Sequence, residues 1–315
     1  MKSGRLLATG GAVGGLALYN QRLARSGGEI GNRIGGETRY FRWKGEDLAY
    51  AVAGEGPPLL MVHGVYAGAS SFEFLKNFLE LSESFRVYAL DLLGCGLSAR
   101  PRRRYEPEDV SSQIEDFARE EIGNPAHLIA SSLTAALAMP ALVRSPRLFK
   151  KAVLICPTGY GSLDRPSGVL GDFIQGLFSA PVIGDSLYHA IVSRPGLRYF
   201  LGGMSYHDRS FVTEELVESY YRISHQPGAK HFPAAFVAGK LNLGVADYWP
   251  RVPHRTMICW GQEAKTTPVS ELQTFLTHNP RTAPRVFRDA ALLPHDERAD
   301  TFNQQVTEFL LAKGA

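Results

Sequence analysis

Residues His127 to Ala138, with the sequence HLIASSLTAALA, combine an apolar run, two serines and a run of small residues. The apolar run is typical of a buried strand, and the small residues that follow favour a helix. A serine at the sharp turn between a strand and a helix exposes its hydroxyl, which can then attack a carbonyl carbon. Ser132 is therefore the candidate nucleophile, although Ala130 and Thr134 replace the glycines that usually flank such a turn.

The bulk composition limits the classes of protein to which the chain can belong. Its 315 residues are enough for one large α/β domain with an insertion, or for two smaller domains. The formal net charge of +3 is too small to indicate a nucleic-acid-binding protein. Three cysteines without a CxxC pair favour a reducing compartment, the cytoplasm, over a disulfide framework. No spacing of potential ligands predicts a metal site, and we expect no cofactor.

Short apolar segments alternate with segments of helical periodicity over most of the chain. Residues 57–64 and 86–94 are continuous apolar runs that end in glycine, as do strands buried on both faces. Apolar residues in 71–84 and 110–123 recur at helical spacing. This alternation predicts right-handed crossovers and a mostly parallel sheet, preceded by a hairpin over 38–54. Further strands are expected at 126–131, 150–158, 255–261 and 284–290.

The alternation stops between residues 159 and 250, where the sequence is helical and aromatic. We interpret this stretch as a helical insertion that covers one end of the sheet. Ligands of open parallel sheets bind beyond the carboxyl ends of the strands, so such a cap would enclose an apolar pocket. The expected organisation is an N-terminal apolar segment with a Gly-rich linker (1–37), a core in two parts (38–158 and 251–315) and the cap between them (159–250).

Six short motifs, in this order and spacing, resemble the α/β-hydrolase superfamily. The resemblance is to its capped branch, which contains epoxide hydrolases, haloalkane dehalogenases and small esterases, and it covers roughly residues 40–312. It implies a mostly parallel α/β-hydrolase sheet with helices on both faces and a helical cap. The motifs are HGV (63–65), DLLGCGLSARP (91–101), ASSLT (130–134), CPTG (156–159), WGQEAKTTP (260–268) and DAALLPHDE (289–297).

The resemblance assigns roles around Ser132. Members of the family hold the developing oxyanion with backbone N–H groups just after the nucleophile and in the loop after the HG pair. In this sequence those donors would be Leu133 and Val65. His63 and Gly64 belong to the same loop, for which we expect a structural or binding role.

The acid and base of the family's catalytic triad are missing at their usual positions. Ala264 stands where the acid follows the WG pair, and Leu292 stands where the histidine base is expected. Neither side chain can transfer or orient a proton. His295 and Glu263 are the nearest candidates for a displaced base and a displaced acid.

These departures leave three hypotheses for function. The leading one is a degenerate hydrolase that binds a small apolar or lipid-like ligand under the cap, with little or no hydrolysis. The alternative is an active serine esterase whose acid and base have been relocated. The third is a membrane-associated partner or scaffold protein, for which the N-terminal segment and the arginines within 100–104 are the evidence.

The N-terminal segment has an apolar run from Leu6 to Tyr19 between basic residues. This run is shorter than the roughly 20 residues that a membrane span requires. It predicts a helix at a membrane surface, a segment packed on its own domain or a partner, or a signal or span. We favour the first, because basic flanks on both sides suit an anionic surface, and expect residues 1–25 to mediate peripheral membrane association.

Overall fold

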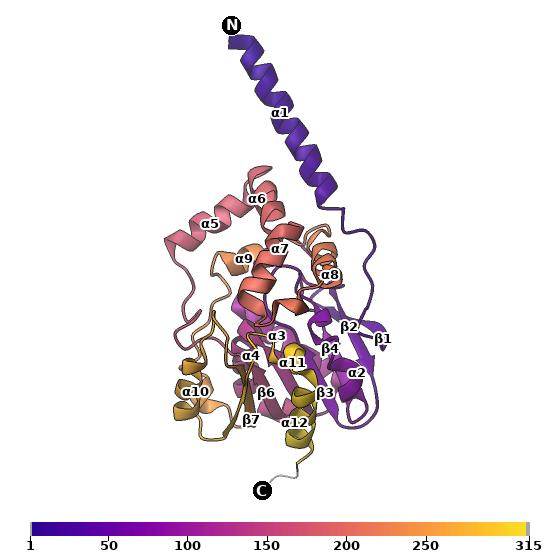
Figure 1. Ribbon diagram of the computed structural model, residues 1–315, viewed down its shortest axis with the longest axis vertical. Helices are drawn as coiled ribbons and strands as arrows, with labels where there is room; N and C mark the ends of the chain where they lie inside the picture. Colours follow the sequence, from indigo (N-terminus) through magenta and orange to yellow (C-terminus); the bar gives the residue numbers. More distant parts are fainter. Residues whose placement is uncertain (1, 313–315) are drawn as a thin grey trace.

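The computed structural model describes residues 2–312, and their side chains from residue 13 onward. It contains an eight-stranded, mostly parallel sheet with helices on both faces, which confirms the predicted fold class (Figure 1). The strand order is β1-β2-β4-β3-β5-β6-β7-β8, with antiparallel pairs only at β1–β2 and β2–β4 among the described strands. The strands are β1 (Glu37–Trp43), β2 (Glu46–Ala53), β3 (Pro58–Val62), β4 (Arg86–Leu90), β5 (Ala126–Ser131), β6 (Phe149–Ile155), β7 (Arg255–Gly261) and β8 (Thr282–Phe287).

The burial of the strands explains their sequences. Every residue of β5 is buried, and so are all but the first residue of β3 and β4, as expected for apolar strands between two helical layers. The hairpin β1–β2 turns at Lys44 and Gly45, whose φ angles are 47° and 87°. Two successive residues with positive φ are the requirement of a tight hairpin turn, and glycine adopts this conformation without strain.

Helices cover both faces of the sheet. On one face α3 packs against α4, which contacts β5 and β6, whereas α2 and α12 pack together on the other face. The helices are α2 (Phe78–Ser82), α3 (Pro107–Asp116), α4 (Ser132–Arg144), α10 (Leu272–His278), α11 (Pro294–Glu297) and α12 (Ala299–Leu311).

The single helix that the periodicity of residues 71–84 predicts is broken into two pieces. A 3₁₀ turn occupies Ser71–Phe74, and α2 begins only at Phe78. Asn77 lies at the break, fully buried, and its amide donates to the carbonyl of His295 at 2.7 Å. A buried amide that is bonded across the fold holds the chain in this position, so tertiary contacts override the local periodicity.

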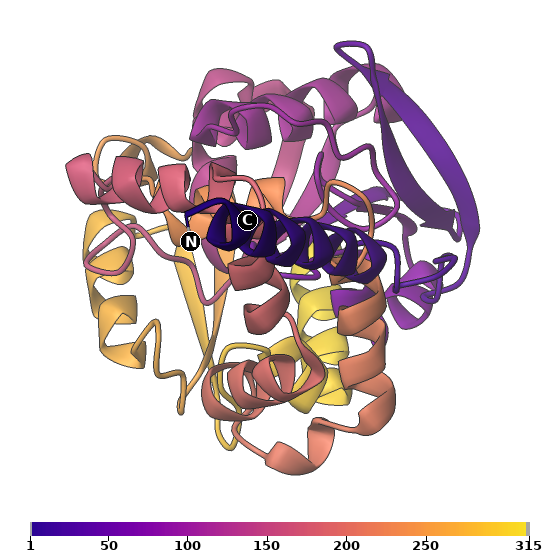
Figure 2. The same ribbon diagram turned by 90° about the horizontal axis from the view of Figure 1, so that it is seen from above.

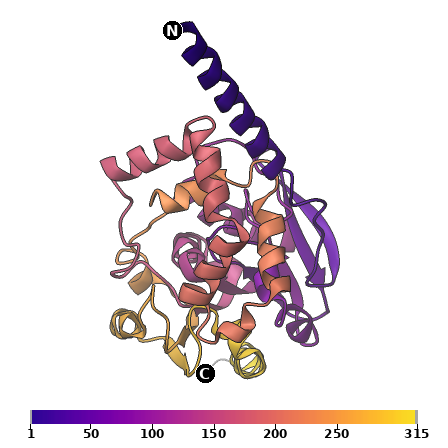
Figure 3. The same ribbon diagram turned by 45° about the horizontal axis from the view of Figure 1, so that its top comes forward.

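The cap contains five α-helices between β6 and β7, above the carboxyl ends of the parallel strands (Figure 3). They are α5 (Val169–Ser179), α6 (Ile183–Ile191), α7 (Arg194–Phe200), α8 (Glu214–Ser224) and α9 (His231–Val237). Several of their apolar residues are exposed, among them Leu170 and Phe173 of α5.

An N-terminal helix, α1 (Lys2–Leu23), projects from the cap side of the molecule and crosses above it (Figures 1 and 2). Its last turns contact α6, where the amide of Asn20 donates to the carbonyl of Val182 at 3.0 Å and to the hydroxyl of Ser186 at 2.8 Å. None of the helices within residues 2–312 combines the length and the apolar character that crossing a membrane requires. The side chains of Lys2, Arg5 and the first half of the apolar run lie outside the described part.

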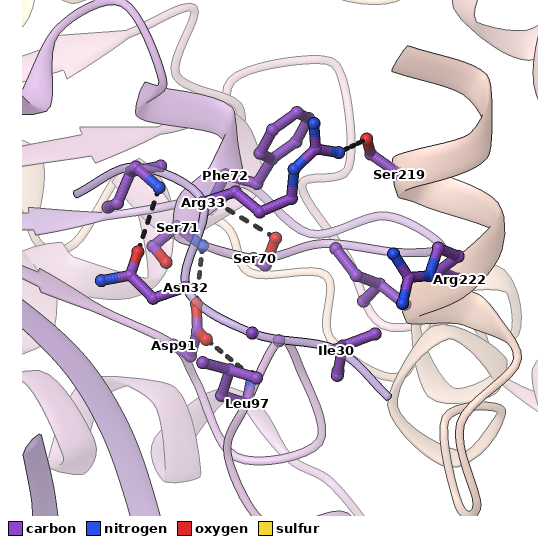
Figure 4. A pocket seen from close by; sticks show the side chains of 14 residues that line it. Ile30, Asn32, Arg33, Ser70, Ser71, Phe72, Asp91, Leu97, Ser219 and Arg222 are labelled. Carbon is purple, nitrogen blue, oxygen red and sulfur yellow. Dashed lines mark hydrogen bonds between the residues drawn. The ribbon is translucent and has the colours of Figure 1, made fainter. Parts of the chain in front are cut away.

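The Gly-rich linker after α1 is bound to the domain along its length. Arg222 of α8 donates to the carbonyl of Gly27 at 3.0 Å, and Gln226 donates to that of Gly28 at 2.8 Å. Figure 4 shows the next part of the linker lining a small pocket, where Arg33 bonds to Ser219 of α8. The linker therefore fixes the base of α1 against the cap.

Candidate functional site

Ser132 stands at the junction of β5 and α4, as the sequence predicts for a nucleophile elbow. Its φ of 55° lies in the left-handed region, which costs a non-glycine residue about 1–3 kcal/mol. Ala130 and Thr134 on either side are fully buried, so the close packing of strand and helix persists without glycines. The turn retains the strained geometry that presents a serine hydroxyl to the cap.

A cavity of about 410 Å³ lies between this turn and the cap. Its size is within the usual range of small-molecule sites. None of the described residues that line it is a histidine, aspartate or glutamate. The lining residues are Val65, Tyr66, Ser131, Ser132, Thr158, Ser162, Leu163, Phe200, Leu201, Met204, Ser205, Tyr220, Phe236, Thr266, Thr267, Leu292 and Leu293.

Leu292 lines the same cavity as Ser132, at the position where a base is expected. Its backbone N–H donates to the carbonyl of Ser205 in the cap at 3.1 Å, so the loop after β8 is tied to the cap. Ala264 is buried in the loop after β7 and is not part of the cavity wall. Leu292 therefore gives the cavity wall an apolar side chain at the position where the family motif has its base.

The two candidates for a displaced base and acid lie away from the cavity wall. His295 is fully buried in α11, and its Nε2 atom lies 3.3 Å from Oε1 of Glu73. Glu263 is half-buried, and its Oε2 atom accepts the backbone N–H of Ala290 at 2.9 Å. This hydrogen bond of Glu263 therefore connects the loop after β7 to the loop after β8.

The loop after β3 is held by buried hydrogen bonds. His63 accepts the backbone N–H of Leu92 at Nε2 at 3.2 Å, so its proton is on Nδ1 and is donated to the carbonyl of Gly64 at 2.7 Å. Both ring nitrogens are thereby occupied, and His63 has a structural role in this geometry. Val65 follows as part of the cavity wall, and Leu133 lies in the first turn of α4, whose N–H groups lack partners within the helix.

Glu73 is a buried carboxylate that the sequence analysis missed. It accepts the backbone N–H of Gly64 at 2.9 Å and the hydroxyl of Tyr66 at 2.7 Å. Burial raises the pKa of its carboxyl, but the neighbouring His295, with the hydroxyls of Ser131 and Tyr66, outweighs this effect and lowers the pKa to about 2. In the sequence, the only indication of this buried carboxylate was a glutamate among the apolar residues of SFEFL.

Two tyrosines complete the polar end of the cavity. The rings of Tyr66 and Tyr220 are stacked with their centroids 5.6 Å apart, and both line the cavity. Burial and the nearby charge of Glu73 raise the pKa of both phenols above the ordinary value, so that both are neutral at physiological pH. They can donate or accept hydrogen bonds but cannot act as a base.

No group of three or more histidine, cysteine, aspartate or glutamate side chains within the described chain is arranged to hold a metal ion. The described residues that line the cavity bring hydroxyl groups and apolar side chains to it.

Comparison with known proteins places the chain in a family. The sequence profile of the "Alpha/beta hydrolase family" matches residues 59–305. The chain belongs to this family, as the order of its motifs predicts.

Individual relatives are distant. The chain is 28% identical to a 2-hydroxymuconate semialdehyde hydrolase from a Pseudomonas species, over 82% of this chain and 88% of that protein. It is 27% identical to a 2-hydroxy-6-oxo-2,4-heptadienoate hydrolase from Pseudomonas putida, over 82% of this chain and 91% of that protein. A bacterial membrane phospholipase A has a similar structure, with a TM-score of 0.72 and 18% identity over 97% of this chain and 95% of that chain. This last likeness concerns the fold alone.

Proposed function

We propose that this protein binds an apolar molecule with a carbonyl oxygen in the cavity above Ser132 and hydrolyses it slowly or not at all. The observation that carries the proposal is the position of Leu292, which lines the same cavity as Ser132 and stands where the family motif has its base. A serine without a neighbouring base is a poor nucleophile. Loss of the histidine of a serine protease lowers kcat by a factor on the order of 10⁶.

The binding part of the proposal depends on features that remain. The carbonyl oxygen would accept the N–H groups of Val65 and Leu133, an interaction that needs no base. The apolar remainder would contact the cap residues Phe200, Met204 and Phe236. Relatives at 27–28% identity are hydrolases of small carbonyl compounds by name, which agrees with a ligand of this kind.

Two measurements on the full chain test the two parts. Calorimetric titration with hexanoic acid should detect binding, and Met204→Trp should abolish it, because Met204 is part of the cavity wall. Turnover of para-nitrophenyl hexanoate should be close to the buffer rate and unchanged in Ser132→Ala. Fast turnover that disappears in Ser132→Ala would favour the active esterase, with His295 and Glu263 rearranged. Absence of hexanoic acid binding would contradict the proposal that the cavity binds an apolar molecule with a carbonyl oxygen.

A second proposal concerns α1, which we infer is covered by a lipid surface that holds the protein peripherally on the membrane. Its described apolar residues are exposed on several sides of the helix: Leu16 is 43% and Leu18 is 64% exposed, about 200° apart around the axis. An isolated helix with apolar residues all round needs an apolar environment. Arg22 and Arg25 at its base suit anionic headgroups.

A further inference from the structure

A second cavity lies inside the cap, next to the cavity above Ser132. It has a volume of about 320 Å³ and is formed mainly by α6, α7 and α9. Tyr66, Phe200 and Phe236 line both cavities, so the two adjoin at these three aromatic side chains. A molecule too long for the first cavity meets these three side chains, and the second cavity lies directly behind them.

The wall of the second cavity is almost entirely apolar. Two of its three tyrosines have their hydroxyls engaged elsewhere: that of Tyr66 donates to Glu73 at 2.7 Å, and that of Tyr188 donates to the carbonyl of Ser224 at 3.0 Å. The lining residues are Tyr66, Ala67, Phe178, Tyr188, Ile191, Gly196, Leu197, Tyr199, Phe200, Pro233, Ala234, Phe236 and Val237. Apart from the hydroxyl of Tyr199, the side chains of this wall offer no free hydrogen-bonding group, and desolvation of polar groups there would oppose their binding.

The outer end of this cavity reaches the surface of the cap. Three of its lining residues are strongly exposed: Ile191 at 44%, Tyr199 at 75% and Val237 at 49%. The second cavity therefore lies between the surface of the cap and the three aromatic side chains that border the cavity above Ser132.

We propose that the second cavity binds an unbranched alkyl chain whose carbonyl end lies at Ser132, which makes the ligand an acyl compound of medium or long chain. This inference rests on the proposed function and adds the class of ligand. The polar end of the combined space contains hydroxyl and backbone N–H donors, and the distal part is apolar, so the two ends match the two ends of an acyl chain. A linear chain requires less displacement of the three shared aromatic side chains than a branched one does.

Affinity should therefore increase with chain length until the second cavity is filled. Burial of one methylene group stabilises a complex enough to raise affinity roughly fourfold. Calorimetric titration of the full chain with hexanoic, decanoic and hexadecanoic acid, each below its micelle concentration, measures this increase.

Two variants narrow the second cavity without touching the first. Val237→Trp fills it from its half-exposed outer end, and Ala67→Phe fills it beside Tyr66. Both should bind hexanoic acid as the unmodified protein does and bind hexadecanoic acid at least tenfold more weakly. Val169→Trp is the matched control, because Val169 is an exposed cap valine that does not line either cavity, and it should bind all three acids normally.

The outcomes separate this inference from the proposed function. If hexanoic acid binds but affinity does not depend on chain length, or if the two filling variants bind hexadecanoic acid normally, the second cavity is not the chain site. If none of the acids binds, the proposed ligand and the chain site both fail.

Discussion

The imidazole of His295 and the carboxylate of Glu73 form a fully buried pair beneath the strand-to-helix turn, with Nε2 and Oε1 3.3 Å apart. The other oxygen of Glu73 accepts the backbone N–H of Gly64 and the hydroxyl of Tyr66. One carboxylate thus connects α11, the loop after β3 and the polar end of the cavity. The histidine that kept its place in the family motif pairs with Glu73 in this network and does not line the cavity with Ser132.

Glu73→Gln should destabilise the protein by about 3 kcal/mol, because removal of one member of a buried pair leaves its partner uncompensated. The amide keeps the shape of the side chain and can still accept the N–H of Gly64. The loss of stability therefore measures the contribution of the charge. Chemical denaturation measures the difference in the free energy of unfolding. Glu80→Gln, on the exposed side of the same segment, is the control and should change stability by less than about 0.5 kcal/mol.

The stabilisation by Glu73 should depend on pH in the acid range. Its pKa is lowered from the ordinary 4.5 to about 2 in the folded protein, so the unfolded chain takes up the proton first as the pH falls. The contribution is complete above pH 4.5 and is lost between pH 4.5 and about 2. The difference in unfolding free energy between the unmodified protein and Glu73→Gln should therefore narrow over this window. A difference that stays constant would show that the charge of Glu73 does not stabilise the fold.

Restoring the missing side chains should restore catalysis. The double replacement Ala264→Asp with Leu292→His places an acid and a base at the positions that the family motif assigns, and Leu292 already lines the cavity with Ser132. Positioned proton transfer contributes about 10²–10⁴-fold to rate. Turnover of para-nitrophenyl hexanoate should rise by a factor in this range, and by more than the two single replacements together, because triad members act as a unit.

Adding Ser132→Ala to the double variant should return the rate to background, which tests whether the new activity uses this serine. Circular dichroism establishes that the variant is folded. A folded double variant without any gain would mean that Val65 and Leu133 no longer hold an oxyanion.

Labelling of Ser132 by a fluorophosphonate should be slow and incomplete in the unmodified protein. Such probes react with an activated hydroxyl, and the cavity wall within the described chain offers no histidine or carboxylate to activate it. Intact-mass spectrometry over time measures the labelled fraction, with Ser132→Ala as the blank. Rapid stoichiometric labelling that Ser132→Ala abolishes would contradict a degenerate site.

Local sequence patterns predicted the core of the fold because parallel strands are continuous apolar runs that alternate with amphipathic helices. They also predicted Ser132 at a strained turn, since strand, serine and helix are adjacent in sequence. The roles of Glu73 and His295 could not be predicted in this way. The two residues are far apart in the chain, and a glutamate at an apolar position does not indicate which residue it pairs with. Likewise, Asn77 breaks a predicted helix through a contact with the carbonyl of His295.

The N-terminal helix should bind the protein to anionic membranes, and its removal should leave the domain folded. A chain that begins at residue 20 keeps the hydrogen bonds of Asn20 to α6 and the bonds between the linker and Arg222 of α8. Deletion of residues 1–25 removes the hydrogen bonds of Asn20 but keeps those between the linker and Arg222. It should therefore lower the melting temperature slightly more than the truncation that begins at residue 20.

Full-length protein should sediment with vesicles that contain phosphatidylglycerol, less so at high salt, because Arg22 and Arg25 contribute electrostatic attraction that salt screens. Both truncated proteins should remain in the supernatant. If the full-length protein does not sediment, or if the truncated proteins sediment equally, another surface or a protein partner covers α1.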